Sequence, residues 1–325
     1  MKRKFLVTGG TGFLGANLVK RLLREGHEVR VLDNNFRGRK NRLTEEKNQV
    51  ETIIGDIRNS LVVEQATIGC QSVVHMAYIN GTDFFYTQPE IVLEVGIKGM
   101  LNVLDACRKH AIGDLILISS SEVYQEPPSI PTSEGVPLII PDVHNPRYSY
   151  GGGKITCELL AINYGRKDFE RVLIIRPHNV FGTDMGREHV IPQFILKAHE
   201  QNQTQPEGPL VFKIQGQGTE TRAFVYIDDF IDGLMLAINK GGHQEIYHIG
   251  TDEEISIANV AKKIVKAFGR EICLKPGPLK KGSAARRCPD ISKIRKLGYS
   301  PKFTFDEAIS PVMNWYVKYA NERPD

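Results

Sequence analysis

The stretch KFLVTGGTGFLG, residues 4–15, decides the fold of this chain. Its apolar run predicts a buried strand, and the glycines that follow predict a tight turn leading into a helix. Gly9 permits a backbone conformation that side chains disfavour, Gly12 lets the backbone approach a pyrophosphate, and Gly15 lets the helix pack against the strand. The amino end of such a helix suits a phosphate because it offers unpaired N–H groups and a partial positive charge. We therefore predict a dinucleotide site.

The next apolar run, residues 28–33, predicts a second strand that ends at Asp33. A carboxylate at this place accepts hydrogen bonds from the adenosine ribose hydroxyls and repels a 2′-phosphate, so NAD is favoured over NADP. Arg37, Arg39 and Lys40 follow closely and would offset part of that repulsion. Strand, glycines, helix, strand and acid in this order indicate a cofactor site rather than an accidental turn.

The composition narrows the class of protein. A chain of 325 residues with 41% hydrophobic residues can bury a full core, and its net charge of +4 comes from scattered basic residues, so nucleic acid is not an expected partner. Five cysteines without CxxC spacing suit reduced thiols, and no metal site is expected. No signal sequence or membrane span is evident. We expect a cytoplasmic protein with no membrane partner.

Strand-like and helix-like segments alternate along the chain. This predicts an α/β fold, a Rossmann-type doubly wound parallel sheet covered by helices on both faces. Further strands are expected at residues 50–55, 72–77, 114–119 and 171–176, and helices at residues 60–68, 89–110 and 150–164. Ligands of such sheets bind at the carboxyl ends of the strands, which makes Asp56, Ile57, Met76 and Ala77 expected contacts of adenine and ribose.

Two regions are expected. Residues 1–177 would form the NAD-binding Rossmann domain, and residues 178–325 mainly a smaller α/β substrate-binding region, although the chain could cross between them. In the second region, loops are longer, strands are expected at residues 210–214 and 245–249, and helices at residues 257–268 and 306–319.

A tyrosine and a lysine four residues apart follow the predicted fifth strand. Tyr150 and Lys154 would share one face of a helix, where the ammonium could lower the pKa of the phenol. Such a tyrosine can take a proton from a sugar hydroxyl while hydride leaves for nicotinamide. Spacing alone favours a packed aromatic and a solvated lysine. The preceding dinucleotide motif and the serines at 119–121 reverse that preference.

These motifs resemble the extended short-chain dehydrogenase/reductase family, which includes nucleotide-sugar epimerases and dehydratases. TGGTGFLG is similar to its glycine motif, Tyr150-x-x-x-Lys154 to its catalytic pair, and Ser120 to its catalytic hydroxyl. The resemblance implies that NAD contacts Gly9, Thr11, Gly12, Phe13, Leu14, Gly15, Asp33, Asn34, Asp56, Ile57, Met76, Ala77, Tyr78, Tyr150, Lys154 and Pro177.

Three later segments extend the resemblance. Asn179 lies in RPHNVFG, which is similar to an RxxNxYG segment of the family. Arg222 lies in GTETRAFVYIDD and Arg287 begins RCPDISK, and both stretches are also similar to family segments. In the family these places hold the diphosphate of a nucleoside-diphosphate sugar, and two guanidiniums with an amide suit phosphoryl oxygens. A homodimer in polysaccharide biosynthesis is also implied, with the helices of residues 89–110 and 150–164 pairing in a four-helix bundle. The stripe that could mediate it, or could face its own sheet, is Val92, Val95, Gly99 and Val103.

The resemblance implies that NAD oxidises sugar carbon 4 to a ketone and is later re-reduced. Ser120, Ser121 and Glu122 look like the matching residues of dehydratases and uronate decarboxylases, whereas plain 4-epimerases usually carry small neutral residues there. Glu122 as a base at carbon 5 favours 4,6-dehydratase-type chemistry, unless it turns outward or ties down the proline-rich loop that follows. A 4-epimerase and a UDP-glucuronate decarboxylase remain alternatives; outside the class are an NADP-dependent ketone reductase and a non-catalytic dinucleotide sensor.

The chain departs from the family pattern at Tyr78, at Gly96 and in the glycines at 151–153. Consecutive glycines cost a helix roughly 1 kcal/mol each relative to alanine. We therefore expect them to serve a close backbone approach to cofactor or substrate. Tyr78, followed by Asn80, is expected near an unusual sugar.

Overall fold

The computed structural model of the chain describes residues 2–205, 207–278, 282 and 284–322. Its main feature is a parallel sheet in the order β11-β6-β5-β4-β1-β2-β3. The strands are β1 (Lys4–Thr8), β2 (Glu28–Asp33), β3 (Val50–Ile54), β4 (Ser72–His75), β5 (Asp114–Ile118), β6 (Arg171–Pro177) and β11 (Glu245–Ile249). The order 3-2-1-4-5-6 confirms the Rossmann-type fold, and each of the first six strands lies where the sequence predicts it.

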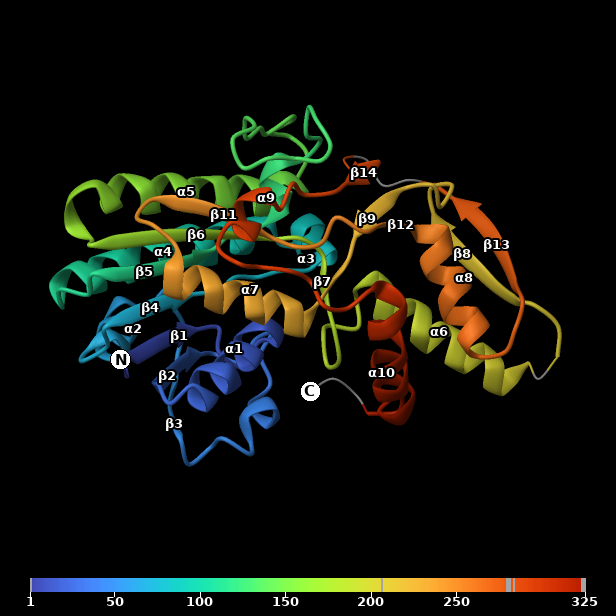
Figure 1. Cartoon of the computed structure of the whole chain (residues 1–325), viewed down its shortest axis with the longest axis horizontal. Helices are drawn as coiled ribbons and strands as arrows, with labels where there is room; N and C mark the ends of the chain where they lie inside the picture. The colour runs from blue at the N-terminus through green and yellow to red at the C-terminus, as the bar shows by residue number, and fades with distance from the viewer. Residues whose placement is uncertain (1, 206, 279–281, 283, 323–325) are drawn as a thin grey trace.

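Helices cover both faces of this sheet (Figure 1). Alternate residues of β1 show why, since Phe5 and Val7 share one core with α1 (Phe13–Arg24) and α7 (Ile227–Lys240), whereas Leu6 lies in the other. The opposite core contains side chains of α2 (Ser60–Thr67), α4 (Pro89–Lys109) and α5 (Tyr148–Asp168). Strands that are buried on both faces need apolar residues throughout, which explains their continuous hydrophobic runs.

The seventh strand shows where the chain crosses between the two regions. Residues 245–249, expected in the second region, form β11, which pairs with β6 and places Ile246 opposite Ile174. The amphipathic helix α7 packs on the same sheet before it. The chain thus crosses back to the first region, and residues 227–249 complete the Rossmann sheet rather than the substrate region.

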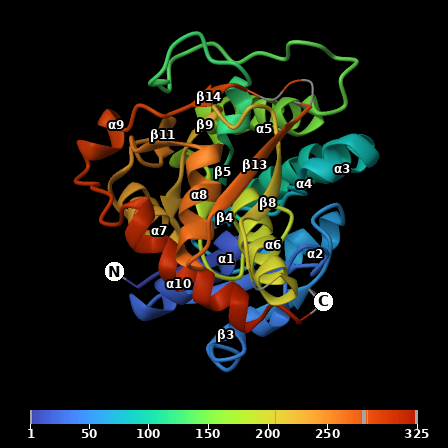
Figure 2. The same cartoon turned by 90° about the vertical axis from the view of Figure 1, so that its right-hand side faces the viewer.

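The smaller region lies beyond the carboxyl ends of the strands (Figures 1 and 2). Its own core is formed mainly by side chains of α6 (Val190–Thr204), α8 (Ile257–Ala267) and α10 (Phe305–Lys318), with the paired strands β8 (Leu210–Gln215) and β13 (Ile272–Gly277). Short strands connect it to the rest: β7 (Val180–Phe181) pairs with β10 (Val225–Tyr226), and β9 (Thr221–Ala223) lies between β12 (Glu254–Ser256) and β14 (Arg286–Arg287). The shorter elements are α3 (Thr82–Thr87), α9 (Ser292–Arg295) and the 3-10 helices η1 (Lys40–Leu43) and η2 (Ser121–Tyr124).

The apolar stripe of α4 faces its own protein. Val92, Gly99 and Val103 are buried, and Val95 packs against the same cores, so the stripe is not available to a second copy. None of the helices in the described ranges is long and apolar enough to cross a membrane.

Candidate active site

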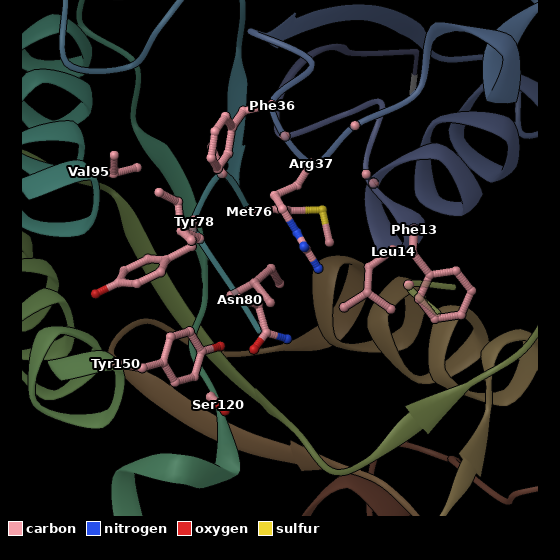
Figure 3. A pocket seen from close by; sticks show the side chains of 18 of the residues that line it. Phe13, Leu14, Phe36, Arg37, Met76, Tyr78, Asn80, Val95, Ser120 and Tyr150 are labelled. Carbon is pink, nitrogen blue, oxygen red and sulfur yellow. The ribbon is translucent and has the colours of Figure 1, made fainter. Parts of the chain in front are cut away.

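A cavity of about 700 Å³ opens at the carboxyl ends of the strands, between the Rossmann sheet and residues 177–189 of the second region (Figure 3). Its lining brings together most of the expected site residues: Gly9, Gly12, Phe13, Leu14, Gly15, Asp33, Asn34, Asp56, Ile57, Met76, Ala77, Tyr78, Ser120, Ser121, Glu122, Tyr150, Lys154, Pro177 and Asn179. Thr11, Arg222 and Arg287 are not in this lining. The structure thus brings most of the expected site residues together in one cavity, and their roles stay predictions.

The glycine turn has the shape that a pyrophosphate requires. Gly9 has a φ of +73°, and a Cβ on Gly15 would overlap the carbonyl oxygen of Gly9. Gly12 precedes α1 without any side-chain cap, so the backbone N–H groups of the first turn stay available to an anion. NAD fits this cradle because its pyrophosphate would take the place of a cap.

Asp33 ties the glycine turn to β2. Its Oδ2 accepts a hydrogen bond from the N–H of Thr11 at 3.0 Å, and its Oδ1 accepts one from the N–H of Asn35 at 2.8 Å. Thr11 is buried at this contact and is not among the residues that line the cavity. Carboxylate oxygens have further lone pairs, which are free to accept a ribose hydroxyl.

The arginines after Asp33 hold the cavity rim instead of a phosphate. Arg39 Nη1 lies 3.1 Å from Asp184 Oδ1, Arg42 Nε lies 2.8 Å from Asp184 Oδ2, and Arg37 pairs with Glu188. These ion pairs form a clasp between residues 37–42 and residues 184–188. The guanidiniums line the cavity and are held by carboxylates there; that they offset part of the repulsion between Asp33 and a 2′-phosphate stays a prediction. The clasp was missed because no local pattern connects carboxylates to arginines so far away in sequence.

Tyr150 packs between two aromatic rings, which together form an aromatic box around it; one of them, Tyr78, is labelled in Figure 3. The ring of Phe85 stacks on it at 4.8 Å and 17°, and the ring of Tyr78 meets it edge-on at 5.2 Å and 88°. Burial raises the pKa of Tyr150, whereas its hydrogen bond with Ser120 acts to lower it. The expected lowering of this pKa is not seen in the structure, because burial outweighs the hydrogen bond with Ser120 and the charge of Glu122 also raises the pKa. Phe85 was not anticipated, since nothing in its sequence context distinguishes it from a core aromatic.

Lys154 contacts Tyr78 more closely than Tyr150. Its Nζ lies 4.1 Å from the centre of the Tyr78 ring and 5.9 Å from that of Tyr150, and it donates a hydrogen bond to the carbonyl of Ile118 at 2.7 Å. Burial lowers the pKa of Lys154 to about 8. Tyr150 and Lys154 share one face of α5, as predicted, but the ammonium of Lys154 also contacts the ring of Tyr78.

Glu122 faces the cavity and is held by arginines. Its carboxylate pairs with both terminal nitrogens of Arg287, one of them at 3.0 Å, and lies 3.7 Å from Arg147 Nη2. Burial alone would raise the pKa of Glu122, but the guanidiniums of Arg287, Arg147 and Arg222 outweigh it and lower the pKa to about 2. An outward-turned Glu122 is therefore excluded, and Arg147 is a neighbour that the sequence did not reveal.

The two expected phosphate arginines lie side by side. In the parallel pair of β9 and β14, Arg222 is opposite Arg287. Burial, followed by the charge of Arg287, lowers the pKa of Arg222 to about 10. Asn179, which lines the cavity, donates a weak hydrogen bond at 3.4 Å to the carbonyl of Ala223, next to Arg222. Sequence motifs more than forty residues apart thus converge on one corner of the site.

The unusual glycines serve the protein's own side chains. A Cβ on Gly96 or Gly153 would overlap the hydroxyl of Tyr78, and a Cβ on Gly151 would overlap the amide of Gln125. The expectation that the glycines admit cofactor or substrate is therefore wrong, since those positions are filled from within. The hydroxyl of Tyr78 is buried between helices rather than presented to a sugar.

Comparison with known proteins agrees with this geometry. UDP-glucuronic acid decarboxylase 1 of Xenopus tropicalis is 30% identical over 98% of this chain and 73% of its own length. A putative UDP-glucose 4-epimerase of Methanocaldococcus jannaschii is 30% identical, covering 95% of this chain and 97% of its own. The crystal structure of the dTDP-glucose 4,6-dehydratase DesIV of Streptomyces venezuelae, which contains NAD, superposes with a TM-score of 0.85 at 27% identity over 97% of both chains. The model of the NAD dependent epimerase/dehydratase family matches residues 5–250, and the chain belongs to this family.

Proposed function

We propose that the protein binds NAD in the cradle of residues 9–15 and oxidises a nucleoside-diphosphate sugar at carbon 4. NAD, when bound, accepts a hydride from that carbon. Tyr150, as the phenolate, takes the proton of the 4-hydroxyl and becomes a neutral phenol; Ser120 orients its oxygen, and the positive charge of Lys154 favours the phenolate before the transfer. The aromatic box around Tyr150 keeps bulk water from the proton transfer. Arg222 and Asn179 are suited to the diphosphate.

The charge balance around Glu122 supports a substrate with an acidic sugar. Three guanidiniums, those of Arg147, Arg222 and Arg287, act on this one carboxylate. The excess positive charge beside the expected position of the sugar is suited to a further carboxylate as well as to phosphate. The single observation that carries the proposal is the Glu122–Arg287 ion pair, which a uronate carboxylate can enter or displace.

Decarboxylation requires less acid–base chemistry than dehydration. A 4,6-dehydratase must remove the proton at carbon 5 and protonate the oxygen leaving carbon 6, whereas a uronate loses carbon dioxide once the 4-ketone can accept the electrons. A carboxylate whose pKa is about 2 is a weak base. Ser121, the neighbour of Glu122, is also a poor acid. We therefore infer that decarboxylation of a nucleoside-diphosphate uronate is the best-supported reaction.

Dehydration is the second candidate because Glu122 lines the cavity. A phosphate or other anion that takes Arg287 from Glu122 would raise the pKa of the carboxyl and restore a base at carbon 5. The sequence alone favours this reaction over decarboxylation. The ion pair changes the balance, because a base committed to arginine must first be released.

Product analysis tests the proposal. The purified protein is incubated with NAD and, separately, with UDP-glucuronate, UDP-N-acetylglucosaminuronate, UDP-glucose and dTDP-glucose, and the products are analysed by mass spectrometry and NMR. We expect loss of carbon dioxide from a uronate. Loss of water from a neutral sugar would establish a dehydratase, and an unchanged mass with an inverted carbon 4 would establish an epimerase. Either result would overturn the decarboxylase. Heat-denatured protein serves as the control.

We also propose that the protein is a cytoplasmic homodimer whose product is used in polysaccharide biosynthesis. The outer surface of α5 supports association, because Leu159 is 59% exposed there. Light scattering of the purified protein would give the mass of a dimer, and a monomer mass would contradict this part.

A further inference from the structure

Tyr78 occupies a slot that two glycines make for it. Its phenol ring lies between α4 and α5, where the hydroxyl contacts Gly96 of one helix and Gly153 of the other. Any side chain at either position would overlap that hydroxyl. Three departures from the family pattern, at 78, 96 and 153, are thus parts of a single packing arrangement.

The hydroxyl of Tyr78 does not explain this arrangement. Within the described part of the chain, its buried oxygen has no hydrogen-bond partner. Burial also raises the pKa of Tyr78 far above its ordinary value, so the phenol stays protonated. An unpartnered buried hydroxyl weakens a fold. The useful part of Tyr78 is therefore its ring.

The face of that ring lies under the ammonium of Lys154. Nζ is 4.1 Å from the ring centre, within the range of a cation–π interaction. Glu158, one turn further along α5, is bound to Arg176 at 2.6 Å and also accepts a hydrogen bond from Ser119. The close partners of the ammonium are thus the carbonyl of Ile118 and the Tyr78 ring.

We propose that Tyr78 is a positioning residue, whose ring stabilises the charged form of Lys154 and holds Nζ near Tyr150, 5.9 Å from the centre of that ring. Gly96 and Gly153 make this arrangement possible, because a side chain at either position would overlap Tyr78. The inference rests on the proposed function in one respect: it takes Lys154 to have a part in the reaction. The effect on the Lys154 charge is independent of the substrate.

A graded set of rings tests the interaction with little change of shape. Tyr78 is replaced by Phe and by phenylalanines with one, two or three fluorines, since each fluorine weakens the negative face of the ring. Lysine labelled with 13C at Cε reports the titration of Lys154 by NMR, and Lys154→Arg assigns the signal. Lys98, which is largely exposed on α4, is the internal control.

The other groups facing Lys154 are Cys157 and Glu158 of α5, His75 of β4 and Tyr150. These groups are the same in every variant, so a change of the Lys154 pKa along the series must come from the ring at position 78. We expect Tyr78→Phe to keep the wild-type pKa of Lys154. Successive fluorines are expected to lower it, by roughly half a unit to one unit over the series, while Lys98 does not move. A Lys154 titration that is the same across the series would overturn the proposal.

A second readout uses the reaction. NADH formation in a single turnover with UDP-glucuronate is followed against pH, and the alkaline limb is expected to move to lower pH by the same amount as the Lys154 titration. A Lys154 shift without a shift of the limb would refute the positioning role while leaving the contact intact. If UDP-glucuronate gives no NADH with the wild-type protein, the choice of substrate is wrong, and the NMR series still decides the role of the ring in holding the charge.

Discussion

Replacing Glu122 by glutamine is expected to destabilise the protein substantially. The pKa of Glu122 falls from an ordinary 4.5 to about 2 in the folded state. At about 1.4 kcal/mol for each unit, this corresponds to roughly 3 kcal/mol of stabilisation at neutral pH. Glutamine keeps the shape but not the charge, so it leaves the buried guanidinium of Arg287 without its counterion. The loss therefore lies in the range of a broken buried ion pair, about 3 kcal/mol.

The pH dependence gives this prediction a definite sign. Because the folded-state pKa of Glu122 is lowered, its stabilisation is fully present above the unfolded-state pKa and is lost as pH falls through the folded-state pKa. Between pH 7 and pH 4 we expect the wild type to lose roughly 0.8 kcal/mol of its advantage over Glu122→Gln. Most of the remainder is lost between pH 4 and about pH 2.

Urea unfolding of a double-mutant cycle measures the effect. Wild type, Glu122→Gln, Arg287→Met and the double variant are unfolded at pH 7 and at pH 4, and the coupling energy is taken from the four free energies of unfolding. We expect a coupling of about 2–3 kcal/mol at pH 7 and a smaller one at pH 4. A coupling below ~0.5 kcal/mol, or one that grows on acidification, would refute the reasoning.

Three further changes have separate readouts. Tyr150→Phe removes the proton acceptor, so NADH formation should fall at least ~10³-fold with little change in melting temperature; retained NADH formation would exclude the tyrosine as the base. Asp184→Asn opens the clasp and should speed NAD release by roughly tenfold in stopped-flow fluorescence, whereas Asp105→Asn on exposed α4 should not; equal rates would show that the clasp does not retain NAD. Gly15→Ala forces a methyl against the Gly9 carbonyl and should cost about 1–3 kcal/mol in urea unfolding, and an unchanged midpoint would contradict the tight turn.

Local patterns in the sequence were sufficient for the first region. The strand, turn and helix of residues 4–24 form as predicted because each step depends on neighbouring residues. Asp56 and Met76 line the cavity, since the carboxyl ends of parallel strands share one edge of the sheet, and their contact with a cofactor stays a prediction. The position of β11 could not be predicted in the same way, because a short apolar run does not specify which sheet it joins.

Interactions between distant residues account for the rest. The pairing of Arg42 with Asp184 joins a loop of the first region to one of the second, and neither sequence context indicates the other. The glycines at 151–153 indicated a close approach, but the approaching groups are side chains of the protein, those of Gln125 and Tyr78, not a ligand. A sequence shows that space is needed at a position, whereas only the packing shows what fills it.

Glu122 and Arg287 show the same limit at the level of function. Each was identified from its own motif, one as a base and the other as a phosphate ligand, yet in the structure each binds the other. An anion that takes Arg287 must therefore break an ion pair, and breaking it raises the pKa of Glu122. Binding of the anion and the basicity of the carboxylate are consequently linked through one guanidinium. In the reaction proposed above, the chemistry that follows the 4-ketone would depend on whether the substrate releases Glu122 or leaves it held by Arg287, so the same ion pair that stabilises the fold would also influence the reaction.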